Sequence, residues 1–587
     1  MSKVLDNMYA ALKPGKYAAI VLGDGIFQGN VYATASRISS LSATKGFQKI
    51  AIVNRDLPKS KRSVQINVRR ANNEQILIIQ KPDARQHYSL VPVNYTLKDF
   101  ERILSDKEKK ALNIPNDNEL ISGDLINNLK KLTFFKGYSI DDTFSDFTLQ
   151  SYFDGSFLNN TGRKKNSKYI THGIHEYKGK FYPQLVRPLI NISKIKEGSI
   201  LWDPYCGSGT ILLEATLCGL NSYGCDINPI AVDIAMAKTS ILFEEQYTVN
   251  HELSEFIDSF DNYDETFNYN ASFNEKNINE ITRWFPQPVI NKLGFLLFEL
   301  KKITNTTIAT FVKVLISSII REISQQEPTD LRIRYRKNRI QDADVLGLLK
   351  KTIIEQMNKI MDYSKISNNN PNHLTKPHIT KGSSCSNDIT FFIAPNSVDI
   401  IITSPPYATA LPYIDINRLS LLILHDMGSS DRNEVESSMT GTREISKKER
   451  QLIEQKINNN DYQDIHSNLA IKIISEILDE NSKGKVGFRK QNTAALLYMY
   501  FNDLNKSMSN MNNALKKNGQ AFIIVGDTKT NTAIDTKYIK TTQIIREMAH
   551  NLGWQFVEEL PISVTKDNHN NIAHAITENT ILWFKKE

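Results

Sequence analysis

The chain has 587 residues, of which 40% are hydrophobic and 23% charged, as in an ordinary globular protein. This composition excludes a disordered chain, a coiled coil and a collagen-like rod. At roughly 150 residues per domain, the length predicts about four domain-sized units. Lys and Arg number 72 against 64 Asp and Glu, so the net charge is +8, which is compatible with a polyanionic partner but does not establish one.

The small number of cysteines and the short apolar runs limit the cellular compartments in which the protein could reside. The four cysteines form no Cys-x-x-Cys pair and have no histidines at zinc spacing, which predicts a reduced, cytoplasmic protein without a metal centre. The N-terminus lacks the apolar core of a signal peptide. The most apolar helical stretch, Phe311 to Ile320, contains Lys313 and is too short to span a bilayer.

Residues 1–83 resemble the last eighty or so residues of the chain. The segment ALKPGKYAAIVLGD, 11–24, aligns without a gap with ALKKNGQAFIIVGD, 514–527, and further landmarks follow in the same order, Gly46-Phe47 with Gly553-Trp554 and Glu74 with Glu578. Both patterns predict a helix end, a buried strand, a helix and two more strands, which together close an α/β domain. Two unrelated βαββ units could look alike by chance, but the preserved order disfavours this.

Residues 84–168 are polar and mixed, and we interpret them as a connector or adaptor. LKDFERILSDKEKKALNI, 97–114, predicts a helix. A basic stretch near the end could contact phosphates, although a short charge run is more often a solvated loop; its members are Arg163, Lys164, Lys165 and Lys168.

Residues 169–250 carry a cofactor-type signature. SILWDPYCGSGTILLEATLCG, 199–219, reads as an apolar strand, a Gly-rich turn and a helix, and the glycines let the backbone approach a ligand at the helix N-terminus. A lone Gly-x-Gly is weak evidence. The next strand, NSYGCDINPIAV, ends in an acidic residue, Asp226, that could accept both ribose hydroxyls.

This combination resembles motif I of the S-adenosylmethionine-dependent methyltransferases that act on amino groups of DNA and RNA. The segment just upstream, HGIHEYKGKFYPQLVRPLI, resembles their motif X, in which a Lys-Phe-x-Pro element packs beside the methionine end of the cofactor. The resemblance therefore implies a cofactor set of Lys180, Phe181, Asp203, Pro204, Cys206, Gly207, Ser208, Gly209, Thr210, Asp226, Ile227 and Asn228. His172 and His175 lie close in sequence, but no third ligand is apparent, so we predict no metal site.

Residues 251–375 are predicted to be a helical insertion, because ITRWFPQPVINKLGFLLFELKKI and ATFVKVLISSIIREI have apolar residues at three- and four-residue spacing. In DLRIRYRKNRIQD, 330–342, the cations alternate with Ile333 and Tyr335, and these cations form a basic strip; its members are Arg332, Arg334, Arg336 and Lys337. It could be a charged loop or edge strand, or a strip that binds a nucleic-acid backbone, and the pattern alone favours neither.

Residues 376–587 are predicted to be the catalytic half. SVDIIITSPPYATALPYID begins with a segment rich in branched residues, which predicts a strand over 398–403 that is buried on both faces. Two prolines at its carboxyl end build a rigid loop at the usual ligand edge of an open α/β sheet. The candidate catalytic residues are Ser404, Pro405, Pro406 and Tyr407.

These residue types suit methylation of a base amino group, whose lone pair is delocalised into the ring. The Ser404 hydroxyl and the Pro405 carbonyl could each accept one N–H, directing the lone pair at the methyl donor. The Tyr407 ring could stack on a base taken out of the duplex. Positioning and polarisation then do most of the work, without a covalent enzyme intermediate.

The constellation resembles the DNA amino-methyltransferase family over about 169–587. The resemblance implies a Rossmann-like class I α/β sheet with a closing antiparallel hairpin, S-adenosyl-L-methionine as cofactor and double-stranded DNA as substrate. Ser-Pro-Pro-Tyr preceded by Thr403 resembles the N4-cytosine branch, since the N6-adenine branch usually shows Asp or Asn in place of Ser. The helical insertion would then contact DNA, which favours the binding interpretation of the basic strip.

Further segments fit the same family pattern. We expect a helix along the cleft over 408–428, with Tyr413 and Arg418 as possible substrate contacts, and a DNA-facing loop, GTRE, at 441–444. Residues 501–517 resemble the helix before the fifth strand, 520–527 that strand, and 554–564 with 580–586 the closing hairpin. Relatives often have Gly-Asp before the catalytic strand, to hold the cofactor's adenine amino group. Here Gly382-Ser383 stands instead, and Asp388 or a backbone group could substitute.

The leading hypothesis is an N4-cytosine DNA methyltransferase that works beside a restriction endonuclease. The alternatives are an N6-adenine DNA methyltransferase, an RNA guanine N2-methyltransferase with similar DPxCGSGT and PPY motifs, and an inactive DNA-binding subunit. Residues 1–83 resemble the tail of a second methyltransferase without its cofactor and catalytic motifs. This suggests descent from, or a truncated reading of, a tandem fusion in which each half modifies one strand of an asymmetric site.

Overall fold

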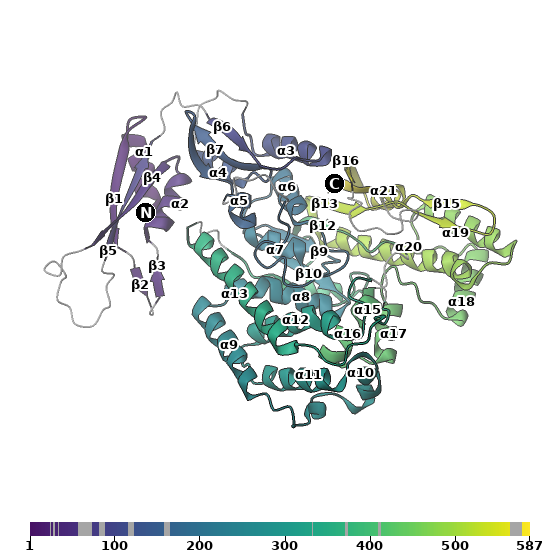
Figure 1. Ribbon diagram of the computed structural model, residues 1–587. Helices are drawn as coiled ribbons and strands as arrows, with labels where there is room; N and C mark the ends of the chain where they lie inside the picture. Colours follow the sequence, from purple (N-terminus) through teal and green to yellow (C-terminus); the bar gives the residue numbers. More distant parts are fainter. Residues whose placement is uncertain are drawn as a thin grey trace. The chain divides into compact units, whose positions relative to one another are not determined.

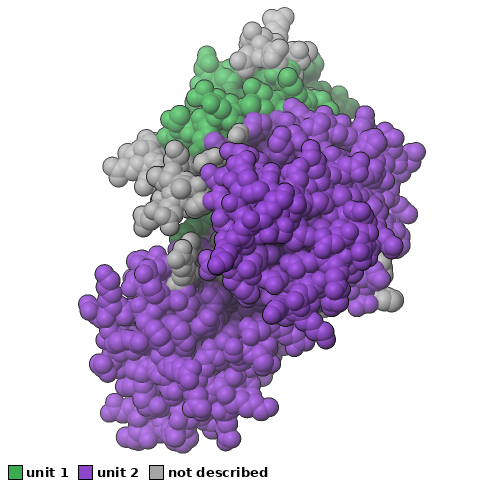
Figure 2. All heavy atoms as spheres, turned by 90° about the vertical axis from the view of Figure 1, so that its right-hand side faces the viewer, with its two compact units in different colours: residues 1–170, 187–194, 359–373 green, residues 171–186, 195–358, 374–587 purple. Residues whose placement is uncertain are grey.

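The computed structural model describes the chain except for residues 24, 28–29, 33, 57–72, 82–87, 116–122, 158–164, 331–332, 370–373, 409–412 and 564–577. The chain forms two compact units, coloured separately in Figure 2. Unit 1 comprises 1–170, 187–194 and 359–373, and unit 2 comprises 171–186, 195–358 and 374–587. Among the described residues, no helix combines the length and the apolar character that a membrane span requires.

Unit 2 is built on a seven-stranded sheet in the order β11-β10-β9-β12-β13-β17-β16. The first five of these strands are parallel, and β17 and β16 close the sheet as an antiparallel hairpin (Figure 1). The strands are β9 (Ile200–Asp203), β10 (Asn221–Asp226), β11 (His378–Lys381), β12 (Val398–Thr403), β13 (Leu515–Val525), β16 (Trp554–Ser563) and β17 (Glu578–Lys586). This is the Rossmann-like methyltransferase sheet that the motifs imply.

Central strands of this sheet are apolar because both of their faces are covered. In β12, Val398, Ile400, Ile401 and Ile402 are all fully buried. One face packs on two helices that carry buried Leu, Ile and Met side chains, α20 (Phe488–Ala514) and α21 (Thr541–Asn551). The turns after β9 and β10, which contain the motifs expected to bind a cofactor, lead into α7 (Thr210–Leu217) and α8 (Pro229–Ser240).

The segment between β10 and β11 is helical, as its periodicity predicts. Its longer helices are α9 (Gln246–Asp258), α10 (Ile278–Trp284), α11 (Gln287–Leu300), α12 (Thr306–Ile323) and α13 (Val345–Asn369). The α12 helix packs along α8 and also contacts α16 (Arg418–Leu424). A single helix was expected over 408–428. Residues 409–412 lie outside the described part of the chain, and the residues after them form two short helices, α15 (Tyr413–Ile416) and α16.

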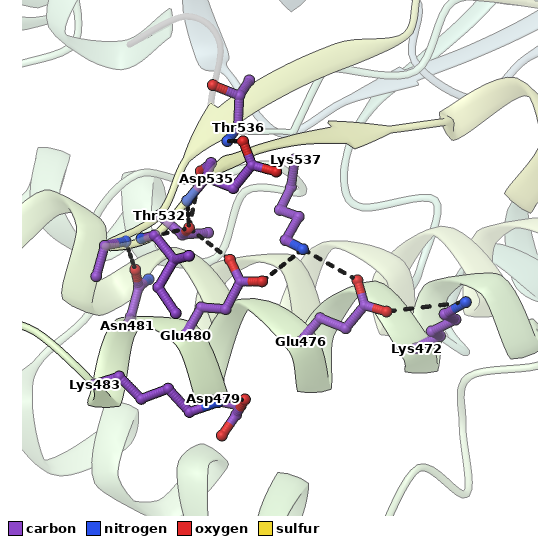
Figure 3. A network of polar contacts seen from close by, with 12 residues as sticks. Lys472, Glu476, Asp479, Glu480, Asn481, Lys483, Thr532, Asp535, Thr536 and Lys537 are labelled. Atoms are coloured by element: carbon purple, nitrogen blue, oxygen red, sulfur yellow. Dashed lines mark hydrogen bonds and ion pairs between the residues drawn. The ribbon is translucent and has the colours of Figure 1, made fainter.

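A polar network holds a small hairpin of unit 2 against a neighbouring helix (Figure 3). The hairpin of β14 (Thr528–Asn531) and β15 (Thr536–Ile539) follows β13, and it lies against α19 (Asn468–Ser482). Lys537 forms an ion pair of 2.6 Å with Glu480, whose other oxygen accepts a 2.7 Å hydrogen bond from Thr532. The ion pair raises the pKa of Lys537 and lowers that of Glu480.

Unit 1 begins with an N-terminal module, residues 1–81, in which a three-stranded antiparallel sheet packs on two helices. The strand order is β1-β5-β4. Ile20, Leu77 and Ile79 face α1 and α2 and pack with the buried Leu5 and Phe47. The elements are α1 (Ser2–Ala11), β1 (Tyr17–Gly23), the hairpin β2 (Gly25–Phe27) and β3 (Asn30–Tyr32), α2 (Thr34–Ala43), β4 (Gln48–Asp56) and β5 (Asn73–Gln80).

The N-terminal module repeats the end of unit 2 in topology and register. Strands β13, β17 and β16 have the same order and directions as β1, β5 and β4, and each set includes a small hairpin after its first strand. Both copies bulge at the same position, Ile50 in β4 and Val557 in β16. Even a lysine contact recurs, since Lys81 donates to the carbonyl of Tyr9 as Lys586 does to that of Asn512.

Residues 84–168, which we interpret as a connector or adaptor, contain a sheet and helices of their own. A second three-stranded sheet, β6-β7-β8, covers its own cluster of buried residues, among them Leu129, Leu132 and Tyr138. The elements are β6 (Tyr88–Pro92), α3 (Asp99–Ala111), α4 (Gly123–Lys131), β7 (Phe135–Ile140), β8 (Thr143–Phe147) and α5 (Leu149–Asp154).

Candidate functional site: two loops at the carboxyl edge of the sheet

The DPYCGSGT segment forms a tight loop between β9 and α7. Gly207 has φ +47° and Gly209 φ +70°, in the left-handed region that favours glycine. A Cβ on Gly209 would lie 2.7 Å from the Cβ of Ala235 in α8, so a larger residue there would push the loop away from that helix. The loop backbone therefore depends on glycine at both positions.

Asp226, at the end of β10, is bound by two backbone amides. The N–H groups of Gly207 and Asn228 donate to its two carboxylate oxygens at 3.0 and 2.9 Å. Burial raises the pKa of Asp226 to about 6, and these hydrogen bonds oppose the rise. A carboxylate has about four acceptor positions, so the two oxygens keep capacity for hydroxyl groups of a ligand.

Lys238 contacts the backbone of the same loop, and sequence reasoning missed it. It lies in α8, is 1% exposed, and donates to the carbonyl of Ser208. Burial holds its pKa well below the ordinary lysine value. The available signal was a lysine within the apolar segment PIAVDIAMAKTS, since a lysine is almost never buried without a partner.

The HEYKGKFYP segment lies beside the same loop. The Tyr177 ring is 3.4 Å from where a Cβ on Gly207 would lie, and Lys180 donates to the carbonyl of His172. His172 forms a 2.9 Å hydrogen bond with the fully buried Glu214, whereas His175 bonds Ser317. Burial lowers the pKa of each histidine to about 4. Among the described residues, no cluster of His, Cys, Asp and Glu could hold a metal ion.

The SPPY segment follows β12, the strand next to β9, so both loops leave the same edge of the sheet. The last residue of β12, Thr403, donates a 2.8 Å hydrogen bond to the carboxylate of Asp203, the last residue of β9. Burial raises the pKa of Asp203 to about 7, and the Thr403 hydroxyl opposes that rise. Within the described part of the chain, the half-buried Ser404 forms no hydrogen bond through its hydroxyl.

Tyr407 is held by the closing hairpin. Its hydroxyl donates to the side-chain oxygen of Asn579 in β17 at 2.8 Å, and burial raises its pKa to about 12. Gly441 of the GTRE segment packs on the same loop, because a Cβ on it would lie 3.0 Å from the Tyr407 carbonyl. Sequence reasoning missed Asn579, which is 172 positions from its partner.

The basic strip divides into structural and solvent-facing cations. Arg336 donates to the carbonyls of Ser324 and Gln326 at 2.9 and 3.1 Å, so it fixes the chain after α12. Arg334 pairs with Asp330, and Arg332 lies outside the described residues. Lys337 is exposed and forms no ion pair among the described residues. The strip is therefore a loop held by hydrogen bonds and an ion pair, and fewer of its cations are free than its sequence suggests.

Aromatic stacking holds this strip against α10. The Tyr335 ring stacks on Trp284 at a centroid distance of 4.3 Å, and the Arg339 guanidinium lies 3.7 Å from the Tyr335 centroid. The earlier basic stretch differs, since Lys165 pairs with the buried Glu101 and lies 5.0 Å from the Tyr95 ring centroid. Arg163 and Lys164 lie outside the described residues.

Comparisons with known proteins give partial matches. Residues 1–237 match the model of the N6_N4_Mtase family, described as DNA methylase. The chain is 25% identical to Type II methyltransferase M.MvaI of Kocuria varians over 416 residues, which cover 68% of this chain and 85% of that protein. The matched family is described as DNA methylase and the relative as a Type II methyltransferase, so both matches agree with the DNA methyltransferase class that the motifs resemble.

Two further likenesses are more local. A tRNA (guanine(10)-N2)-dimethyltransferase of Methanocaldococcus jannaschii is 36% identical over 86 residues, which are 15% of this chain and 22% of that protein. A Thermus thermophilus protein described as a putative DNA modification methylase, solved with S-adenosyl-L-methionine, aligns at 15% identity and a TM-score of 0.12, covering 40% of this chain and 73% of that one.

Proposed function

We propose that the chain transfers a methyl group from S-adenosyl-L-methionine to the exocyclic N4 of cytosine in duplex DNA. The observation that carries the proposal is the juxtaposition of the DPYCGSGT and SPPY loops at one sheet edge, where Thr403 bonds Asp203. Such a juxtaposition brings a cofactor loop and an amino-group loop together on adjacent strands. The proposed setting is a restriction-modification system in the cytoplasm, with a cognate endonuclease as a possible second component.

The residues present fit this cofactor. Asp226 is at the end of β10 with acceptor capacity remaining, and the Gly207–Gly209 turn opens the N-terminus of α7 to a ligand. S-adenosyl-L-methionine supplies an electrophilic methyl group when bound. Tyr177 borders the same loop, and together with the Lys180-Phe181 segment it would enclose the cofactor's methionine end.

Ser404 and Pro405 would orient the base. The Ser404 hydroxyl has no other hydrogen-bond partner among the described residues, so it can accept one N–H of a cytosine amino group while the Pro405 carbonyl accepts the other. Tyr407, anchored by Asn579, would stack on a flipped base. Anchoring reduces the ring's freedom before binding, which lowers the entropic cost of positioning the base.

Two alternatives use the same machinery. N6-adenine methylation is disfavoured by Ser404, since family members acting on adenine usually have Asp or Asn there. Methylation of RNA guanine N2 is favoured by the local likeness to a tRNA methyltransferase. It is disfavoured by the longer likeness to a Type II enzyme and by the motif X-like segment.

Transfer of labelled methyl groups, followed by digestion to nucleosides, distinguishes these activities. Duplex DNA of mixed sequence and bulk tRNA serve as parallel substrates, with the Ser404→Ala variant as control. N4-methylcytosine in DNA is the expected product. N6-methyladenine alone would overturn the cytosine assignment, labelled tRNA would overturn the DNA assignment, and no transfer to any substrate would favour an inactive DNA-binding subunit.

A further inference from the structure

The outer edge of β1 has no partner strand among the described residues. β1 pairs with β5 on one side only, and the sheet ends there. Its sequence, YAAIVLG, contains neither a charge nor a proline, although proteins commonly place such residues on open edges to prevent pairing with other chains. Tyr17 and Val21 are 59% and 55% exposed. β1 therefore has the composition of an interior strand at an edge position.

The repeat in unit 2 shows what lies on the equivalent edge. Tyr17 corresponds to Gln520 in β13, because both begin the matching ladders with β5 and β17. On its other side, β13 pairs with the parallel strand β12, in register from Ile400 with Gln520 to Thr403 with Ile523. β12 is the strand that leads into the Ser-Pro-Pro-Tyr loop. The equivalent edge of β1 is thus shaped for a parallel strand of this kind.

The open face of the N-terminal module points to the same occupant. Val21 and Val53 point to the face away from α1 and α2, and they are 55% and 46% exposed. Their counterparts, Ile524 and Leu560, are only 2% and 6% exposed in the complete sheet of unit 2. Ile50 makes the contrast, since it is 44% exposed and its counterpart Val557 remains 41% exposed. The apolar positions left open are those that the rest of a methyltransferase domain would cover.

We propose that the N-terminal module docks a second polypeptide that carries the cofactor-binding half and the catalytic strand of a methyltransferase domain. That strand would add to the edge of β1 in parallel, as β12 adds to β13, by backbone hydrogen bonds. The apolar face around Val21 and Val53 would be buried in the same contact, which supplies the hydrophobic driving force. The complex would have a second site of the same architecture, completed by residues of this chain.

Glu74 would contribute to that second site. It pairs with Gly23 and Arg55 across the sheet, which places it in the register position of Asn579 in unit 2. Asn579 accepts a hydrogen bond from the hydroxyl of Tyr407. A Pro-Pro-Tyr loop arriving on β1 would therefore bring its tyrosine hydroxyl to the Glu74 carboxylate, which is also an acceptor. In this chain the Glu74 carboxylate forms an ion pair of 4.0 Å with Arg55.

The test compares retention of a partner by three forms of the tagged full chain, expressed in the organism that encodes it. They are the natural chain, Val21→Lys and Ile50→Lys. Lysine at 21 would be buried in the docked complex, whereas lysine at 50 would stay in solvent as the counterpart Val557 does. Both replaced side chains are about half exposed in this chain, so neither substitution should prevent folding, and circular dichroism checks this. Retained polypeptides are identified by mass spectrometry, and complex masses by light scattering.

The expected result is a polypeptide with both an Asp-Pro-x-x-Gly-x-Gly segment and a Pro-Pro-Tyr segment, retained by the natural chain and by Ile50→Lys. Val21→Lys should retain it less, by about tenfold or more, because an unpaired charge would be buried. Absence of such a polypeptide, equal loss in both variants, or a homodimer with β1 as its interface would overturn the proposal. The inference rests on the repeated sheet and not on the proposed reaction. Methyl transfer by the chain alone, measured in parallel, should be unchanged in Val21→Lys.

Discussion

Thr403 and Asp203 are 200 positions apart in the chain, yet the threonine hydroxyl donates a 2.8 Å hydrogen bond to the aspartate carboxylate. Each is the last residue of its strand, and each precedes one of the two loops of the candidate site. The bond fixes the distance between the loops at their base. Because burial raises the pKa of Asp203 to about 7 while this bond lowers it, the bond favours the ionised carboxylate.

Thr403→Val should destabilise the protein by about 1–2 kcal/mol at pH 8 and by less at pH 5.5. The hydroxyl stabilises the charged form of Asp203, so its loss matters most where that form dominates, above pH 7. Urea denaturation at the two pH values measures this. Thr403→Ser, which keeps the hydroxyl, is the matched control, and an equal loss at both pH values would contradict the assigned role.

Ser404→Ala should slow methyl transfer without weakening cofactor binding. Loss of one hydrogen bond to the reacting amino group, worth about 1.5–3 kcal/mol, corresponds to a fall of roughly 10- to 100-fold in the single-turnover rate. Isothermal titration with S-adenosyl-L-methionine should give an unchanged Kd. A parallel loss of affinity would place Ser404 in the cofactor site instead.

Asp226→Asn should weaken cofactor binding and remove its pH dependence. The pKa of Asp226 is raised to about 6, so protonation below that pH removes acceptor capacity, and affinity in the natural chain should fall from pH 8 to pH 5. The variant, which cannot ionise, should bind the cofactor more weakly at pH 8, by about tenfold or more. Its affinity should change little with pH. If the natural chain binds equally well at both pH values, the carboxylate does not hold the ligand.

The elements of the methyltransferase sheet could be predicted where the signal is local. The strand over 398–403 was predicted from its branched residues, and it forms β12 with these bounds. The strand ending at Asp203 and the closing hairpin also formed as expected. In each case the strand's own composition reports burial on two faces, or a turn residue marks its end.

Contacts between distant residues could not be predicted in this way. Asn579 is joined to Tyr407, and Lys238 to Ser208, only because strands and helices far apart in sequence meet at the site. The repeat was visible in sequence, but its last landmark is shifted. The strand pairings show that Glu74 is equivalent to Asn579 and not to Glu578. Strand pairing, not residue identity, sets this correspondence.

Arg336 and Lys337 should respond differently to replacement by alanine. Arg336→Ala removes donors to the carbonyls of Ser324 and Gln326, and should cost about 1–3 kcal/mol of unfolding free energy. Lys337→Ala should leave stability within about 0.5 kcal/mol. If the strip contacts DNA, Lys337→Ala should also reduce by about 1 the slope of log DNA affinity against log salt concentration. Chemical denaturation and binding measured across salt concentrations separate the two; unchanged DNA binding in Lys337→Ala would remove the strip from the interface.

Glu108 should make unit 1 less stable as pH rises. It is fully buried, and it accepts hydrogen bonds from the Thr133 hydroxyl and amide at 2.6 and 3.0 Å and from Asn191 at 2.7 Å. Desolvation nevertheless raises its pKa from 4.5 to about 7. The folded state therefore binds the proton more tightly than the unfolded state does. The resulting stabilisation is fully present below about pH 4.5 and is lost as pH rises through 7.

The free energy of unfolding should accordingly fall by roughly 3 kcal/mol between pH 4.5 and 7.5 through this residue. Glu108→Gln, which cannot titrate, isolates the effect, because Asp203 and Asp226 also have raised pKa values and contribute to the slope of the natural chain. Urea denaturation at half-unit pH steps, followed through the transition of unit 1, gives both curves. The variant should show the shallower curve, and identical slopes would mean that Glu108 stays ionised in the folded protein.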